Sequence, residues 1–236
     1  MNGKSWMAGL ALAVIGIPMA FAAALHVAPI SIQMAPGQSA ATLTLKNEGD
    51  KPMHAQVRVF DWSQAQGKDN LGDTQTLIAS PPAIDVAPQG SQTIRLVRTA
   101  KSTVTREESY RVLIDEIIDP ATAPLNGVNV QLRYSVPVFM SPDGMKPPRM
   151  TVTASIEGQT LTLKAQNNGG QHANVSAVTL ENAGGESVTV DAGLLGYVLV
   201  GQIMEWKLKL PPEGTAKGQF VTLRCRFNGE EFTTKL

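Results

Sequence analysis

The side chains best suited to chemistry are few in this sequence and lie far apart. The three histidines, His26, His54 and His172, fall on separate predicted elements and share no metal-ligand spacing. Serines are numerous, but no G-x-S-x-G elbow or glycine-rich phosphate loop occurs. We therefore expect surface or hydrogen-bonded histidines, no catalytic residue, no metal site and no cofactor, which argues against an enzyme.

Cys225 is the only cysteine, so the chain has no internal disulfide. It lies in phase with the apolar residues of the stretch from Val221 to Phe227. A reactive thiol needs electropositive surroundings that favour the thiolate, and no histidine or acid flanks this one. The pattern predicts a small buried hydrophobic residue.

The densest acidic group is formed by Asp115, Glu116 and Asp119. Adjacent residues of a strand point to opposite faces, whereas a calcium loop needs oxygen ligands at alternate positions and a turn glycine. These acids therefore predict a solvated strand end.

The balance of charges limits the kinds of partner that the sequence indicates. Twenty basic and twenty acidic residues balance, which gives no indication of nucleic acid or an anionic membrane surface as partner.

The first residues are typical of a signal peptide over residues 1–24: Lys4 is followed by an apolar run from Met7 to Phe21 and by alanines at 22–24. An uncleaved single-span anchor is the alternative, and no stable membrane insertion is expected elsewhere.

The rest of the chain alternates short strand-like runs with turns at intervals of about ten residues, which predicts an all-β fold of antiparallel sandwiches. The prolines and glycine between Ser141 and Pro148 predict a connection between two domains, residues 25–142 and 150–236, with a hinge at 143–149. The stretch from Ser63 to Thr74 predicts a polar loop, and Tyr197 to Val200 a separate strand.

The most regular strand pattern runs from Val128 to Met140, with an apolar side chain at every even position. Such alternation places all of them on one face of a strand. That face could fill the core of its own domain or add to the sheet of a partner, and alternation leaves both open. Pro137 favours the second, because proline cannot donate to a β-ladder and occurs at sheet edges or bulges.

Several segments, in family order along the chain, resemble the PapD-like periplasmic chaperones of the chaperone-usher pilus pathway. They are Ser31 to Gly37, Leu45 to Gly49, Gln56 to Trp62, Ser80 to Ala83, Val86 to Gly90, Ile94 to Arg98 and Arg106 to Val112. Leu132 to Phe139, Gly196 to Gly201 and Trp206 look like the archaic, Csu-like branch.

The resemblance implies two immunoglobulin-like domains in a boomerang arrangement. It implies a periplasmic chaperone, without cofactor, that binds pilus subunits by donor-strand complementation and delivers them to an outer-membrane usher. The donated strand would be the alternating stretch, with Val128, Val130 and Leu132 in the groove of the subunit and Tyr134 and Val136 continuing the same face.

The chain departs from the family where the carboxyl terminus of the subunit is usually held. An arginine and a lysine are usual there, but Ser31 and Pro137 occupy the aligned positions. A buried carboxylate without a cation is costly, so another arginine is expected to replace them. The candidates are Arg95 and Arg98, then Arg111 and Arg133, with solvated surface arginines as the alternative.

A second departure concerns the inter-domain ion pair of the family. Its acid aligns with Glu107, but the position of its arginine partner is Ser141. That ion pair is therefore not predicted.

Two other functions remain as alternatives. A structural pilus component or extracytoplasmic β-sandwich binding module would have an incomplete sandwich or an N-terminal donor extension. A periplasmic hydrolase would need a catalytic constellation, which the sequence does not supply.

Overall fold

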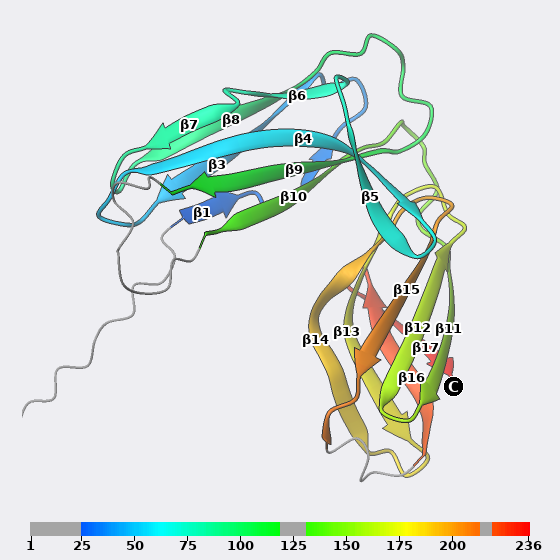
Figure 1. Ribbon diagram of the computed structural model, residues 1–236. Coiled ribbons are helices and arrows are strands. Elements are labelled where there is room, and N and C mark those ends of the chain that lie inside the picture. Colours follow the sequence, from blue (N-terminus) through cyan, green and yellow to red (C-terminus); the bar gives the residue numbers. More distant parts are fainter. Residues whose placement is uncertain (1–24, 119–130, 213–218) are drawn as a thin grey trace, which may run out of the picture.

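The computed structural model describes residues 25–118, 131–212 and 219–236. The predicted signal peptide and two predicted donor residues, Val128 and Val130, lie outside these ranges. The described residues form strands β1 to β17 in two groups that meet at an angle, which confirms the predicted all-β, two-domain architecture (Figure 1). In these ranges we find no helix that has the length and hydropathy needed to span a bilayer.

The N-terminal domain consists of two sheets. The first has the order β1 (Leu25–Ala28), β3 (Ala40–Asn47), β8 (Ser91–Arg98) and β6 (Leu77–Ser80). The second has the order β2 (Ile32–Met34), β10 (Arg133–Met140), β9 (Glu108–Ile117), β4 (Met53–Ala65) and β5 (Lys68–Asp73), with β7 (Ala83–Val86) paired to β4.

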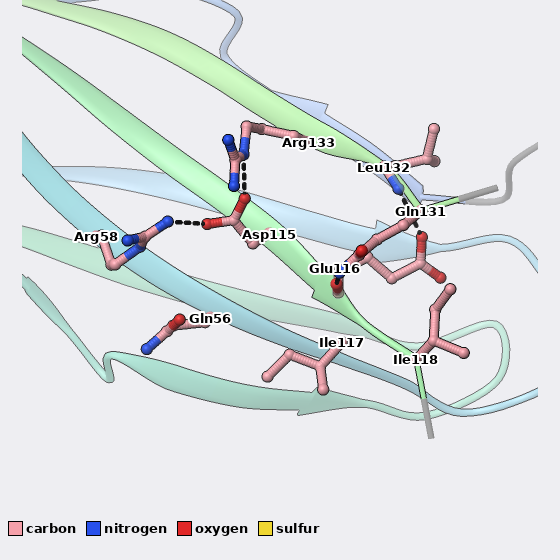
Figure 2. Close-up of a pocket in the computed structure, with 9 residues that line it drawn as sticks. All are labelled: Gln56, Arg58, Asp115, Glu116, Ile117, Ile118, Gln131, Leu132 and Arg133. Atoms are coloured by element: carbon pink, nitrogen blue, oxygen red, sulfur yellow. Dashed lines mark hydrogen bonds and ion pairs between the residues drawn. The ribbon is translucent and has the colours of Figure 1, made fainter. Parts of the chain in front are cut away.

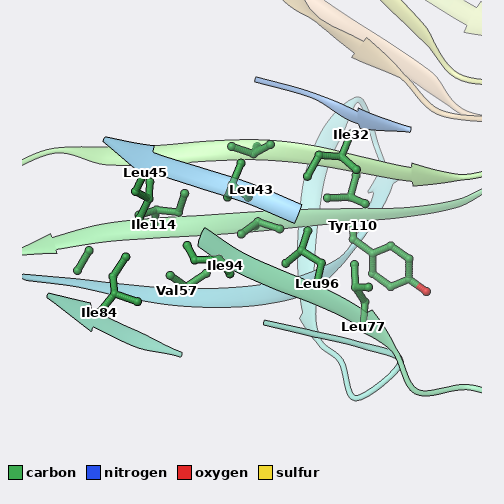
Figure 3. Packing of buried hydrophobic residues seen from close by; sticks show 14 of the residues in the cluster. Ile32, Leu43, Leu45, Val57, Leu77, Ile84, Ile94, Leu96, Tyr110 and Ile114 are labelled. Atoms are coloured by element: carbon green, nitrogen blue, oxygen red, sulfur yellow. The ribbon is translucent and has the colours of Figure 1, made fainter. Parts of the chain in front are cut away.

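The two sheets enclose one apolar core (Figure 3). Leu43 and Ile94 reach into it from the first sheet, and Val112 and Ile114 reach into it from the second. All four are fully buried, and each contributes roughly 1.5 to 3 kcal/mol relative to an exposed side chain. Because alternate residues of each strand face this core, the other face of each sheet is free for other contacts.

The C-terminal domain is a second sandwich. One sheet has the order β11 (Met150–Glu157), β12 (Thr160–Asn167) and β15 (Ile203–Lys209), and the other β14 (Ser187–Val198), β13 (Ala173–Asn182), β16 (Phe220–Phe227) and β17 (Glu230–Lys235). Cys225 is buried in its core, as predicted, and burial raises the pKa of the thiol to about 11.

Two of the predicted elements were wrong. Ser63 to Thr74 is not a loop but a hairpin, in which β4 turns into β5 through Gln66 and Gly67, both with positive φ. All of β5 is exposed, so no apolar alternation marks it in the sequence. Tyr197 is not the start of a separate strand, because β14 runs on to Val198 with irregular pairing to β13.

The β4–β5 hairpin extends from the N-terminal domain to the C-terminal domain (Figure 1). At its tip, Gly67 forms a backbone bridge with Met204. Close to the tip, the buried side chain of Gln64 donates to the Tyr197 carbonyl at 2.9 Å and accepts from the Leu199 amide at 2.9 Å. These contacts place the two domains relative to each other.

Gly169 offers a test of how tightly the inter-domain connection packs against the second domain. A Cβ there would lie 2.4 Å from the Pro147 carbonyl oxygen and 2.5 Å from the Arg149 nitrogen. Gly169→Ala should lower the free energy of unfolding by about 2 kcal/mol or more, measured by denaturant titration. Gly72→Ala is the matched control, because its Cβ would meet nothing within 4 Å. Equal midpoints for the two variants would contradict this packing.

Candidate functional site

The apolar face of β10 changes its surroundings along the strand. Leu132, just before the strand, and Tyr134 are half-buried, whereas Val136, Val138 and Met140 are buried in the core of the N-terminal domain. The end of this strand near the hinge therefore serves its own domain. The opposite end leaves apolar surface uncovered.

One edge of β10 is only partly paired in the described part of the chain. β9 pairs with the strand from Arg133 to Met140. On the other side, β2 pairs in parallel with Val138 to Met140 alone. Pro137, which has no N–H to donate, is the last residue before this second pairing begins, in agreement with its predicted place at an edge.

An apolar depression of about 420 Å³ opens beside the unpaired edge, between β1 and β10. Leu25, Val27, Ile30, Tyr134 and Val136 line it, and Ile30 is 82% exposed. The Tyr134 hydroxyl donates to the Leu25 carbonyl at 2.5 Å. The apolar interior of the domain is therefore accessible at this edge, which is an unusual arrangement unless a partner covers it.

The start of β10 is held against the end of β9 by polar contacts around Glu116 (Figure 2). The Glu116 amide donates to the Leu132 carbonyl at 3.0 Å, and the Leu132 amide donates to the Glu116 carboxylate at 3.3 Å. The Gln131 side chain donates to the Glu116 carbonyl at 2.5 Å. The backbone at Leu132 is therefore ordered while its side chain stays partly uncovered.

Asp115 lies at the centre of an ion-pair cluster with Arg58, at 2.7 Å, and Arg133 (Figure 2). Burial raises the pKa of this carboxyl, but hydrogen bonds and charges from the two arginines outweigh burial and hold its pKa below the usual value. The predicted solvated strand end is thus wrong for Asp115, whose side chain is 12% exposed. Asp119 lies outside the described residues.

Three of the four candidate anchoring arginines lie away from the domain junction or have an acidic partner. Arg95 is exposed on β8, in the sheet opposite β10. The Arg98 side chain is 8% exposed, and its guanidinium pairs with Glu108 at 3.1 Å and donates to backbone carbonyls of the following loop. Arg133 pairs with Asp115.

Arg111 differs from these three. It pairs across β9 and β10 with Pro137, on the face of the sheet turned toward the second domain. Its Cζ lies 3.6 Å from the centre of the Trp62 ring and 5.3 Å from that of Tyr197. Among the described residues no acid lies within ion-pair distance of it. Burial lowers the pKa of Arg111 and the charge of Asp69 opposes this, so the group stays a cation.

Arg111 lies beside residues of both domains that we call the junction cluster: the rings of Trp62, Phe139, His172 and Tyr197 and the side chain of Leu199. Tyr197 meets Trp62 edge to face at 5.4 Å, and His172 stacks on Phe139 at 3.3 Å with an interplanar angle of 6°. Trp62, Phe139 and Leu199 are buried. The apolar contact between the domains therefore also forms the wall of the Arg111 site.

Glu107 links the domains through a histidine in place of an arginine. Its carboxylate accepts from the His172 amide at 2.7 Å, lies 3.0 Å from His172 Nδ1 and accepts from the Ser141 hydroxyl at 2.9 Å. Sequence reasoning placed Glu107 and Ser141 but missed His172, because the histidine is remote in the chain and no motif marks it. The other histidines also pair with acids, His26 with Glu48 and His54 with Asp85, which agrees with the expected surface or hydrogen-bonded histidines.

His172→Ala should weaken the contact between the domains, because it removes both the stacking on Phe139 and the side-chain contact with Glu107. We expect a loss of about 1 to 3 kcal/mol in the free energy of unfolding and a wider distribution of inter-domain angles by small-angle scattering. His54→Ala is the control, since its ion pair with Asp85 is exposed and should contribute little. Scattering profiles that match for both variants and the wild type would contradict a linking role for His172.

Comparisons with known proteins bear on the fold and on the family. The family model described as "Pili and flagellar-assembly chaperone, PapD N-terminal domain" matches residues 24–146. No curated protein matches the chain. A chain in the CsuC–CsuE chaperone–tip adhesion subunit pre-assembly complex, from archaic chaperone-usher Csu pili of Acinetobacter baumannii, is similar with TM-score 0.66 and 22% identity, over 89% of this chain and 97% of that one.

Two further solved structures show the same two-domain fold. A chain in the complex of Salmonella enterica SafA pilin with the SafB chaperone is similar with TM-score 0.60 and 20% identity, over 90% of this chain and 96% of that one. The YadV chaperone is similar with TM-score 0.60 and 19% identity, over 90% of this chain and all of that one.

Proposed function

The chain belongs to the family of pili and flagellar-assembly chaperones with a PapD N-terminal domain, and on this premise we propose that it captures pilus subunits by donating β10 and the residues before it. The observation that carries this proposal is the partly unpaired edge of β10 beside an apolar opening of the domain core. An incomplete subunit that pairs along this edge would satisfy the free backbone groups and cover the apolar surface.

The donated side chains are Val128, Val130 and Leu132, with Tyr134 at the border between partner and home domain. Val136 is 3% exposed in the core of its own domain, so it continues the same face without leaving that core. Each aliphatic side chain that becomes fully buried in the subunit would contribute roughly 1.5 to 3 kcal/mol.

In this proposal the mature protein works in the periplasm after removal of residues 1–24 and passes the subunit to an outer-membrane usher. Neither a cofactor nor catalysis is needed. The free edge of the subunit drives capture, and exchange of the donated strand for that of another subunit ends it.

Co-purification tests the proposal. Tagged chaperone is isolated from the periplasm with the genes of its own cluster expressed, and we expect a small β-rich subunit in about equal amount. Val130→Glu with Leu132→Glu should abolish its recovery, because both charges would have to enter the apolar groove of the subunit. The fold of the variant is checked by circular dichroism.

Ser155→Glu is the matched control, because Ser155 is exposed on β11 of the second domain, apart from β10 and from the residues that line the depression. It should retain the subunit. Recovery of an unchanged complex from the folded Val130/Leu132 variant would overturn the donor assignment.

For the carboxyl terminus of the subunit we propose Arg111 as the anchor. It is the candidate that faces the junction without an acidic partner in the described residues, and it lies opposite Pro137, where a lysine is usual in the family. The Arg111 guanidinium carbon lies 3.6 Å from the centre of the Trp62 ring. A guanidinium that stacks on a ring face directs its N–H groups outward in its own plane, where a carboxylate binds in bidentate geometry.

Arg111→Gln should reduce capture at least a hundredfold, measured as the dissociation constant of the co-purified subunit, because a desolvated carboxylate would lose its counter-charge. Arg95→Gln, on the opposite sheet, should leave the constant within about twofold. Unchanged capture by Arg111→Gln together with loss in Arg95→Gln or Arg133→Gln would move the anchor to one of those residues.

A further inference from the structure

The side chain of Tyr197, from the second domain, lies beside Arg111. The Tyr197 ring packs against Trp62 and lies 5.3 Å from the Arg111 guanidinium carbon. The two groups are close enough for the charge of Arg111 to act on the ionisation of the phenol. A carboxylate bound to the Arg111 guanidinium would therefore have the Tyr197 side chain nearby.

Ser31 completes this arrangement from the first domain. Its side chain is close enough to that of Tyr197 for a hydrogen bond that lowers the pKa of the phenol. Ser31 immediately precedes β2, whose Ile32 pairs with Val138, so it lies in the row of residues that continues through Pro137 to Arg111. When the Ser31 hydroxyl donates to the phenolic oxygen, the phenolic proton is free for another acceptor.

We propose that the Tyr197 hydroxyl is a second hydrogen-bond donor to the terminal carboxylate of the captured subunit, so that residues of both domains form one anchor. This inference rests on the proposed function, because it deepens the role of the Arg111 site. It assigns a binding role to a residue of the second domain and gives Ser31 the role of orienting it.

The electrostatic surroundings suit this role. Burial raises the pKa of Tyr197, and the charge of Arg111 and the hydrogen bond from Ser31 reduce that rise without cancelling it. The phenol therefore stays protonated, and able to donate, over the pH range in which a carboxylate is charged. A carboxylate has two oxygens with about four acceptor sites, enough for both the guanidinium and the phenol.

A two-domain anchor would make the angle between the domains part of the binding site. Tyr197 is held by the junction cluster, and its carbonyl accepts from Gln64 of the hairpin at 2.9 Å. The contacts that fix the domains therefore also fix the distance between the two proposed donors. A shift of the second domain would separate the phenol from the guanidinium.

The test uses a synthetic peptide with the last dozen residues of the co-purified subunit, made with a free terminal carboxylate or a terminal amide. Wild-type chaperone should bind the acid form more tightly. Tyr197→Phe keeps the ring and its stacking, and should weaken binding of the acid by roughly tenfold while leaving binding of the amide unchanged. Tyr110→Phe is the control, because its hydroxyl donates to Glu108 at 2.8 Å, outside the anchor.

The outcomes separate the two proposals. No preference of the wild type for the acid form, or an equal preference in Arg111→Gln, would overturn the Arg111 anchor and this inference with it. If Arg111→Gln loses the preference while Tyr197→Phe keeps all of it, Arg111 stands and the role of Tyr197 is refuted. An equal loss for acid and amide in Tyr197→Phe would assign the tyrosine to packing and also refute the proposed donor.

Discussion

The guanidinium of Arg111 lies against the ring of Trp62, 3.6 Å from its centre, with no acid within ion-pair distance among the described residues. A cation taken partly out of water gains from the ring face, and its N–H groups point outward in its own plane, where they can bind a carboxylate. Arg111 lies between the two domains, because Trp62 belongs to the first domain and Tyr197, whose ring is the next one to it, belongs to the second. Arg111 therefore places a cation that can bind a carboxylate within the apolar junction cluster.

The junction itself follows from a hairpin that the sequence hides. Exposed residues on both faces of β5 leave no period-two pattern, so the segment has the composition of a polar loop. The hairpin nevertheless reaches the second domain with its turn at Gln66 and Gly67. There, Gln64 is buried between backbone groups of Tyr197 and Leu199. Tertiary contact, not local preference, decides the structure here.

Most strands of the two sandwiches were predictable because one of their faces is buried, and Val112, Ile114 and Val138 show this alternation directly. The partner of Glu107 was not predictable, because His172 reaches it only through the packing of one domain on the other. The four arginines look alike in the sequence. What distinguishes them is burial and the presence of an acid nearby, and both depend on strand register.

The central claim is that Arg111 holds the carboxyl terminus of a subunit paired along β10. A crystal structure of the chaperone with its co-purified subunit tests it most directly. We expect the terminal carboxylate at about 2.7 to 2.9 Å from the Arg111 guanidinium, with the last strand of the subunit beside the unpaired edge of β10. A carboxylate bound at Arg95, Arg98 or Arg133, or left in solvent, would contradict the account.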